Sequence, residues 1–176
     1  EQYTDEQELI DYTVKVVRAI CEKIIESEKD LTKLDTLVGD GDMGLSFKRG
    51  AQLVLERIEP EKVKNVAQLI RTVALAVQEI GGSSGALLSA GILTLAHSLK
   101  ENRKEQGVKL WSIAMDQGVT AISKLGGATK GSRTMMDALI PLKEELLGCA
   151  KTNATGQELR EKLVKASQDG ADSTKD

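Results

Sequence analysis

The sequence predicts an all-α fold, an antiparallel bundle or barrel of about seven to eight helices. Apolar residues recur at helical spacing through seven segments of the chain. Turns rich in glycine, or marked by proline, separate most of these segments. No segment shows the sustained period-2 alternation of β-branched and aromatic side chains that predicts a strand, and the stretch 34–38 is too short. Because the links between helices are short, we expect neighbouring helices to run antiparallel.

The first three helices follow from caps, apolar spacing and stop signals. Thr4 followed by Gln7 forms a capping-box pattern, and apolar residues continue at helical spacing to about Ser27. A second periodic run begins near Met43 and is interrupted by Pro60. A third, dense in Val, Leu and Ala, covers residues 63–80. It stops at two consecutive glycines, so the sequence predicts a turn there.

The remaining helices are marked by similar signals. A fourth run begins at Ser83 and extends to about Leu99, and the polar stretch 100–107 predicts a loop. A fifth helix is predicted over 108–125, followed by a glycine C-cap signal. A sixth begins near Thr134 and contains Pro141, which should bend it or mark a short break. The seventh opens with the capping-box pattern Thr155-x-x-Glu158 and continues towards residue 171.

Length and composition exclude several classes of protein. The 176 residues fit one domain, 1–176, and 40% hydrophobic residues suffice for one core. The net charge of −3 and four aromatic residues (one Trp, two Tyr, one Phe) argue against a nucleic-acid-binding surface. No apolar run of about 20 residues predicts a membrane span. Cys21 and Cys149 lie far apart within apolar patterns, so we expect buried free thiols in a reducing cytoplasm. The lone His97 is expected to be structural or at the surface, since no zinc-ligand partner accompanies it.

The segment 34–44 has the most unusual chemistry in the chain. Asp35, Asp40 and Asp42 fall within eight residues, among glycines at 39, 41 and 44. Crowded carboxylates repel one another, and a hard divalent cation such as Mg²⁺ removes that cost while leaving positions for phosphate oxygens. A solvated acidic turn is the alternative, because Asp and Gly are common turn residues. A dinucleotide fingerprint is excluded because no strand precedes it, and an EF-hand is excluded because its twelfth position is Ala51.

Two further segments are candidates for binding phosphate. In residues 81–86, small residues and two serines stand at a predicted helix start, where free N–H groups bind anions. Close helix packing is an equal alternative for that segment. Residues 126–137 combine glycines, Lys130, Arg133 and Thr134, although the segment is not a Walker loop and could be a surface turn. Taken together, the three segments suggest a metal–nucleotide site for phosphoryl transfer.

The order of these motifs resembles a known family. Leu-Asp followed by Gly-Asp-Gly-Asp-x-Gly, then Gly-Gly-Ser-Ser-Gly-Ala-Leu, then Arg-Thr-Met-x-Asp-Ala-Leu with a later proline, is similar to the nucleotide-binding L subunit or domain of dihydroxyacetone kinase. The resemblance covers roughly residues 35–141. It implies a helical barrel with ADP or ATP and two Mg²⁺ ions at one end. It also implies that the family's later Gly-Arg-Ala-x-Tyr and Asp-Pro-Gly lid segments, with the last helix, lie outside this chain.

The resemblance implies a role for each matching residue. Asp35, Asp40 and Asp42 match the metal-holding aspartates through which catalysis would act. The implied nucleotide contacts are Gly44, Leu45 and Ser46 beneath the phosphates, Ser83 and Ser84 in the small turn, and Gly126 and Met135 beside the adenine, with Thr134 and Asp137 in the same motif. Ser132 stands where the family usually has an acidic residue.

The implied activity needs a partner. In the family, a histidine of a separate K subunit or domain holds dihydroxyacetone covalently, and His97 is not assigned that role. Family members rephosphorylated by a phosphohistidine protein of the phosphotransferase system often carry His and Asn at the positions of Met43 and Ser46, so this chain resembles the ATP-dependent kinases more. The alternatives are a phosphotransferase-dependent L subunit, a kinase component for another carrier-bound substrate, and a nucleotide-sensing regulator.

Overall fold

The protein is all-α throughout the part of the chain that the structure describes. A computed structural model describes residues 6–175, and these form eight α-helices and three short 3₁₀ segments with no strand. The described residues divide into two compact units, 6–93 and 94–175, and the boundary falls within helix α5 (Gly82–Glu101). Each unit has its own packed helices, so each is described separately.

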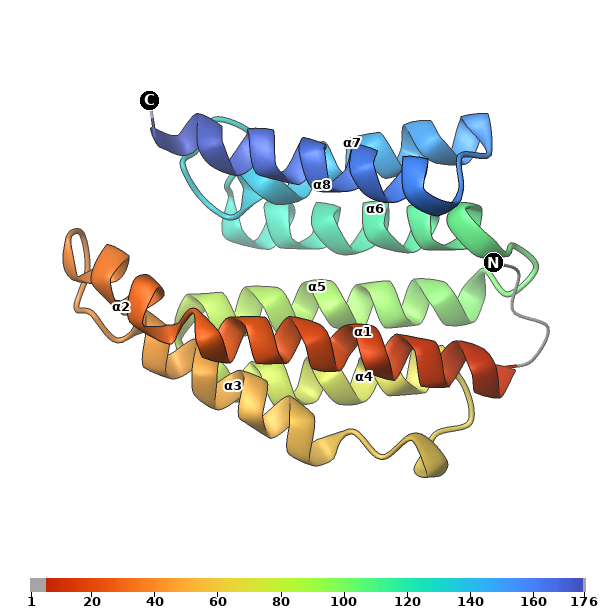
Figure 1. Ribbon diagram of the computed structural model, residues 1–176, viewed down its shortest axis with the longest axis horizontal. Helices are drawn as coiled ribbons and strands as arrows, with labels where there is room; N and C mark the ends of the chain where they lie inside the picture. The colour runs from red at the N-terminus through yellow and green to blue at the C-terminus, as the bar shows by residue number, and fades with distance from the viewer. Residues whose placement is uncertain (1–5, 176) are drawn as a thin grey trace. The chain divides into compact units, whose positions relative to one another are not determined.

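The first unit is built around helix α3. It contains α1 (Glu6–Glu26), α2 (Glu28–Thr36), α3 (Met43–Arg57), α4 (Val66–Val77), two 3₁₀ turns, η1 (Pro60–Lys62) and η2 (Gln78–Ile80), and the first part of α5. Helix α3 packs against α1, α2, α4 and η2. Helices α1, α3 and α4 run in alternating directions (Figure 1). The unit's buried apolar residues include Ile10, Val14, Val54, Leu69, Ile70, Ala74 and Ile80.

The second unit consists mainly of three helices that pack against one another in chain order. It contains α6 (Gly107–Gly126), α7 (Met136–Thr152), α8 (Gly156–Asp172) and η3 (Ser173–Lys175), and α7 packs on both α6 and α8 (Figure 1). Helices α7 and α8 approach closely at Gly170, where a Cβ atom would overlap the backbone carbonyl of Asp137. Pro141 lacks the N–H that would bond this carbonyl in a regular helix. A glycine therefore allows α8 to pack where α7 has a free carbonyl.

Most of the predicted helices are confirmed. The first predicted helix ends at Glu26, the second begins at Met43, and the glycine C-cap of α6 is confirmed because Gly127 has φ +70°. Helix α4 begins at Val66 rather than residue 63, because the Asn65 side chain accepts a hydrogen bond from the Gln68 N–H and caps the helix there. The predicted loop 100–107 is shorter, since α5 continues to Glu101 and α6 begins at Gly107.

Three local expectations differ from the structure or fall outside it. Helix α7 continues through Pro141 to Thr152, so of the two expected effects, a bend or a short break, the break is wrong. Thr155 is the N-cap residue of α8, but its side chain makes no capping hydrogen bond. Thr4, the first residue of the predicted capping box of α1, lies outside the described residues.

The two cysteines and the single histidine lie where the sequence predicts. Cys21 and Cys149 are both buried, and burial raises the pKa of each thiol above its ordinary value of 9.0. Both thiols therefore stay protonated near neutral pH. His97 is exposed on α5. Over residues 6–175, no helix has the length and apolar character needed to cross a membrane.

Candidate functional site: an acidic loop opposite a glycine–serine turn

The acidic loop is fixed at both ends by helices. Asp35 lies on the last turn of α2, and Asp42 is the N-cap residue of α3. The Asp35 backbone carbonyl accepts hydrogen bonds from the N–H groups of Val38 and Gly39, which closes the turn after α2. Its carboxylate Oδ2 accepts a hydrogen bond from the Met43 N–H at 3.1 Å. One aspartate thus joins the end of α2 to the first turn of α3.

Glycines allow the loop to fold this tightly. A Cβ atom at Gly39 would overlap the Asp35 carboxylate, and Gly41 has φ +77°, a conformation that side chains with a Cβ rarely adopt. Gly44 is buried against α2, where a Cβ atom would overlap the Glu28 carbonyl oxygen and the Thr32 hydroxyl. Gly44 therefore has a structural role in the packing of α3 on α2. Its implied phosphate contact stays a prediction.

The three aspartates form one cluster of carboxylates. One oxygen from each of Asp35, Asp40 and Asp42 lies within 4.8 Å of the other two. The negative charge of Asp40 raises the pKa of Asp42, with smaller contributions from burial and Asp35, while Arg49 opposes the shift. Because Mg²⁺ takes carboxylate oxygens as ligands, the cluster is a candidate Mg²⁺ site.

A pocket of about 420 Å³ joins this cluster to the glycine–serine turn, which is formed by residues 81–84 and is called the Gly81–Ser84 turn below. The turn connects η2 to α5, and Gly81 and Gly82 have φ +84° and +59°. From Gly82 on, the turn is the start of α5, whose first backbone N–H groups have no partner within the helix. The pocket is lined by Asp35, Asp40, Asp42, Met43, Ser46, Phe47, Arg49, Ile80, Gly81, Gly82, Ser83 and Ser84. The structure therefore brings together the first two of the three predicted segments, which lie about 40 residues apart in the sequence.

The pocket also contains residues that were not predicted from the sequence. Arg49 contributes the one cationic side chain among the residues that line it, and Phe47 and Ile80 contribute apolar surface. Arg49 could have been found by its position, since it lies two turns after Asp42 on the same helix. Leu45, an implied nucleotide contact, is 59% exposed on α3, whereas Ser46 is half-buried and lines the pocket.

The third predicted segment belongs to the second unit. Gly126 ends α6, and Met135 precedes α7. Thr134 and Asp137 bond backbone N–H groups just before α7: the Thr134 hydroxyl accepts a hydrogen bond from the Met136 N–H at 3.2 Å, and the Asp137 Oδ2 accepts one from the Thr134 N–H at 2.9 Å. The other Asp137 oxygen accepts a hydrogen bond from the Gly131 N–H. These two residues thus shape the loop before α7, and their contact with a nucleotide stays a prediction.

Replacing Asp137 with Asn should lower stability in a pH-dependent way. Hydrogen bonds from the Thr134 and Gly131 N–H groups lower the pKa of Asp137 below its ordinary value of 3.8. A carboxylate whose pKa is lower in the folded state stabilises the fold above its ordinary pKa and loses this effect as the pH falls. We expect Asp137→Asn to melt at a lower temperature than the wild type at pH 7 and the difference to shrink below about pH 4. Thermal unfolding followed by circular dichroism at both pH values tests this; an equal difference at both would contradict it.

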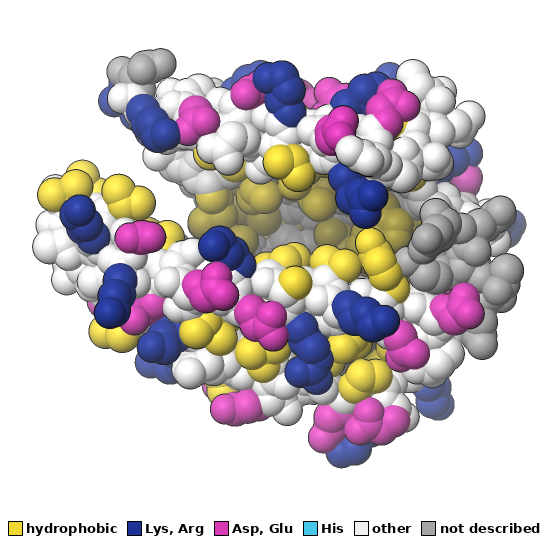
Figure 2. All heavy atoms as spheres, viewed as in Figure 1, with side chains coloured by type: hydrophobic (Ala, Val, Ile, Leu, Met, Phe, Trp, Pro, Cys, Tyr) yellow, Lys and Arg dark blue, Asp and Glu magenta, His cyan; other side chains and the backbone are white. Residues whose placement is uncertain are grey.

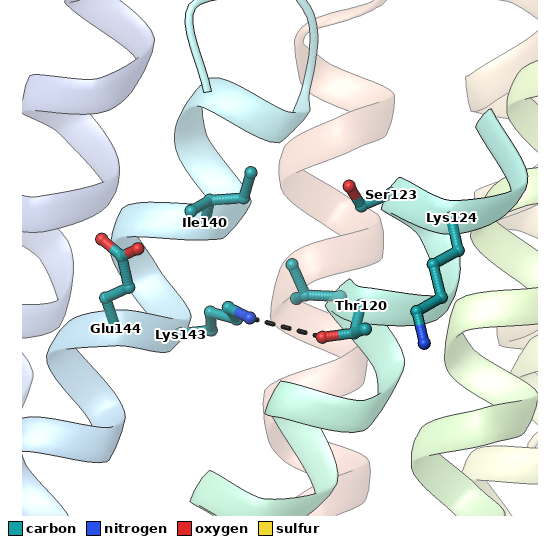
Figure 3. A pocket seen from close by; sticks show the side chains of 7 residues that line it. Thr120, Ser123, Lys124, Ile140, Lys143 and Glu144 are labelled. Atoms are coloured by element: carbon teal, nitrogen blue, oxygen red, sulfur yellow. Dashed lines mark hydrogen bonds between the residues drawn. The ribbon is translucent and has the colours of Figure 1, made fainter. Parts of the chain in front are cut away.

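A second hollow, of about 300 Å³, lies between α6 and α7 (Figure 3). Lys143 donates hydrogen bonds to Asp116 Oδ1 at 2.8 Å and to Thr120 Oγ1 at 3.3 Å. Figure 3 shows the lysine directed along the wall towards Thr120. The charge of Lys143 is therefore neutralised within the unit, and the contact links α7 to α6.

The sequence matches one family model and several curated proteins. The DAK2 domain model matches residues 37–176. The chain is 32% identical over 162 residues to a human triokinase/FMN cyclase, covering 91% of this chain and 28% of that protein. It is 31% identical over 158 residues to dihydroxyacetone kinase 1 of Saccharomyces cerevisiae, covering 87% of this chain and 26% of that protein.

A solved structure shares the fold. A crystal structure of the dihydroxyacetone kinase from C. freundii in complex with AMP-PNP and Mg²⁺ aligns with a TM-score of 0.74 and 26% identity, over 99% of this chain and 30% of that chain. The chain thus spans less than a third of each of these relatives. The family model nevertheless matches most of this chain and includes two of the three aspartates, the glycine–serine turn and the loop before α7. The chain therefore belongs to the DAK2 domain family.

Proposed function

We propose that this chain binds an adenine nucleotide with Mg²⁺ and is the nucleotide-binding component of a dihydroxyacetone kinase. The observation that carries the proposal is the single pocket lined by both the three aspartates and the Gly81–Ser84 turn. Carboxylates suit Mg²⁺, and N–H groups at a helix start suit phosphate oxygens. The relative crystallised with AMP-PNP and Mg²⁺ supports the same combination of ligands.

In this proposal Asp35, Asp40 and Asp42 hold two Mg²⁺ ions, which would neutralise the charge that develops on the transferred phosphoryl group. Ser83 and Ser84 bind phosphate oxygens at the start of α5. Ser46 lines the pocket and would lie beneath the phosphates. In this proposal none of these side chains acts as a covalent nucleophile, and the chain contributes positioning and charge stabilisation. Gly44, Leu45, Gly126, Thr134 and Met135 complete the proposed nucleotide contacts.

The phosphoryl acceptor is proposed to arrive on a partner, the K subunit or domain that carries dihydroxyacetone. The chain spans 28% of the human relative, so most of such a kinase lies outside the matched region. Exposed apolar side chains support a protein partner at this end of the first unit. Leu34 is 63% exposed, Leu37 is 75% exposed and Val38 is 92% exposed, all beside the aspartate cluster. Figure 2 shows apolar side chains gathered over this end of α2.

The phosphoryl donor is proposed to be ATP, and a donor assay tests the function as a whole. The chain would be mixed with a dihydroxyacetone kinase K subunit, dihydroxyacetone, Mg²⁺ and either ATP or a phosphohistidine protein of the phosphotransferase system. We expect dihydroxyacetone phosphate to form with ATP and to require both proteins, because the nucleotide and the acceptor lie on different chains. Reactions that omit either protein are the controls. Product with the phosphohistidine protein and none with ATP would contradict the proposed donor.

A further inference from the structure

Arg49 connects helix α3 to the end of η2. Its Nη2 atom donates a hydrogen bond to the Ile80 carbonyl oxygen at 3.1 Å and a longer one to the Glu79 carbonyl oxygen at 3.4 Å. Carbonyl groups at the end of a helix lack the N–H partners that the next turn would supply. Arg49 therefore supplies hydrogen-bond donors to the backbone carbonyls directly before the Gly81–Ser84 turn.

The junction of α3 and η2 is also closely packed. Gly50, the neighbour of Arg49, faces the buried Ile80 so closely that a Cβ atom at Gly50 would overlap the Ile80 side chain. Two turns further along α3, Arg57 forms an ion pair with the Glu79 carboxylate at 2.6 Å. Of the two arginines, Arg49 lies nearer to the start of α3, where Asp42 is the N-cap, and only Arg49 lines the pocket.

The carbonyl contacts of Arg49 should favour the binding of an anionic ligand at the neighbouring turn, for an electrostatic reason. The carbonyl groups at the end of η2 carry the negative end of a helix dipole, whereas the N–H groups at the start of α5 carry the positive end of another. Both ends meet at the Gly81–Ser84 turn. A polyphosphate attracted by the N–H groups would be repelled by the neighbouring carbonyls. A guanidinium that binds those carbonyls offsets the repulsion and fixes the turn.

Building on the nucleotide role proposed above, we propose that Arg49 is a positioning residue: it holds the Gly81–Ser84 turn opposite the aspartate cluster, so that metal and phosphate can be bound together. Arg49 acts through the backbone of Glu79 and Ile80, so its loss should weaken nucleotide binding more than metal binding. Lysine keeps the charge but lacks the planar fork of donors, and it should restore the function only in part.

The test compares Arg49→Gln, Arg49→Lys and Arg57→Gln with the wild-type chain. Calorimetry measures the affinity for Mn²⁺ alone and for ADP with saturating Mg²⁺. For Arg49→Gln we expect at least about tenfold weaker ADP binding with no loss of Mn²⁺ affinity, and for Arg49→Lys an intermediate loss of ADP affinity. Arg57→Gln removes only an exposed ion pair to the same 3₁₀ turn and should leave both affinities within about twofold of wild type. Unchanged ADP binding in Arg49→Gln, or parallel losses of ADP and Mn²⁺ binding, would overturn the proposal.

Hydrogen exchange separates this inference from the proposed function. The N–H groups of Gly81 and Gly85 bond the carbonyls of Gln78 and Gly81 across the turn. These two amides should exchange about tenfold faster in Arg49→Gln than in Arg57→Gln, with no ligand present. If the wild-type chain fails to bind ADP, the nucleotide function is wrong, and the exchange rates still decide whether Arg49 positions the turn. Equal rates in the two variants would show that it does not.

Discussion

Replacing Asp40 and Asp42 together with Asn is expected to abolish Mg²⁺-dependent binding of ADP. The two changes remove two of three carboxylates whose oxygens lie within 4.8 Å of one another, so little negative charge remains to hold a divalent cation. Loss of a residue that merely orients a metal ligand weakens metal binding about 10–100-fold. Removal of two ligands should therefore weaken ADP binding by more than about 100-fold. Titration calorimetry with ADP at saturating Mg²⁺ measures the loss.

The helices of this double variant should remain intact, because the two substitutions relieve the repulsion that raises the pKa of Asp42. A matched control replaces Asp11 and Asp30, two exposed residues on α1 and α2, with Asn. The control changes the net charge equally and should bind ADP as the wild type does. If the Asp40/Asp42 variant keeps wild-type affinity for ADP, the aspartates do not form the metal site.

Replacing Gly44 with Ala is expected to destabilise the first unit and to disturb the proposed metal site at the same time. The added Cβ atom would overlap the backbone carbonyl of Glu28 and the hydroxyl of Thr32, and backbone cannot move aside as a flexible side chain can. Forcing extra volume into a packed contact typically costs about 1–3 kcal/mol. Since α2 must shift away from α3, the Asp35 carboxylate should lose its hydrogen bond from the Met43 N–H. Chemical denaturation and ADP calorimetry measure the two effects.

Gly148→Ala is the matched control for this substitution. Gly148 lies exposed on α7, and a Cβ atom added there would meet no other atom within 4 Å. Alanine at an exposed helical glycine should stabilise the fold by about 0.5–1 kcal/mol and leave ADP binding unchanged. A Gly44→Ala variant as stable as wild type would show that α2 does not pack against α3 as described.

Helix α2 shows why part of the fold could not be predicted. Residues 28–36 were not predicted to form a helix, because no apolar stripe runs through them, and in the structure none of their side chains is buried. Tertiary contacts stabilise this helix instead: Gly44 lets α3 approach its backbone, and Lys48 on α3 forms an ion pair with Glu28 at 3.6 Å. Periodicity detects helices that bury an apolar face, so a helix held through backbone proximity is missed.

In the candidate site, too, some residues could be predicted from the sequence and another could not. The aspartates and glycines of residues 35–44 indicated a metal loop from sequence because their chemistry is local. The contribution of Arg49 was missed because its partners, the carbonyls of Glu79 and Ile80, lie some 30 residues away and carry no side-chain signal. Backbone acceptors are identical in every residue, so only the folded chain shows which of them a guanidinium reaches.

From the sequence alone came the helical class, most helix ends, the family resemblance and the three acidic side chains. These features depend on caps, spacing and composition within a few residues, where local interactions decide the outcome. Only the tertiary structure placed the Gly81–Ser84 turn across one pocket from the aspartates and gave Gly44 its place against α2. Such placements depend on how helices pack across long sequence separations, and packing is decided by the complementary shapes of whole faces.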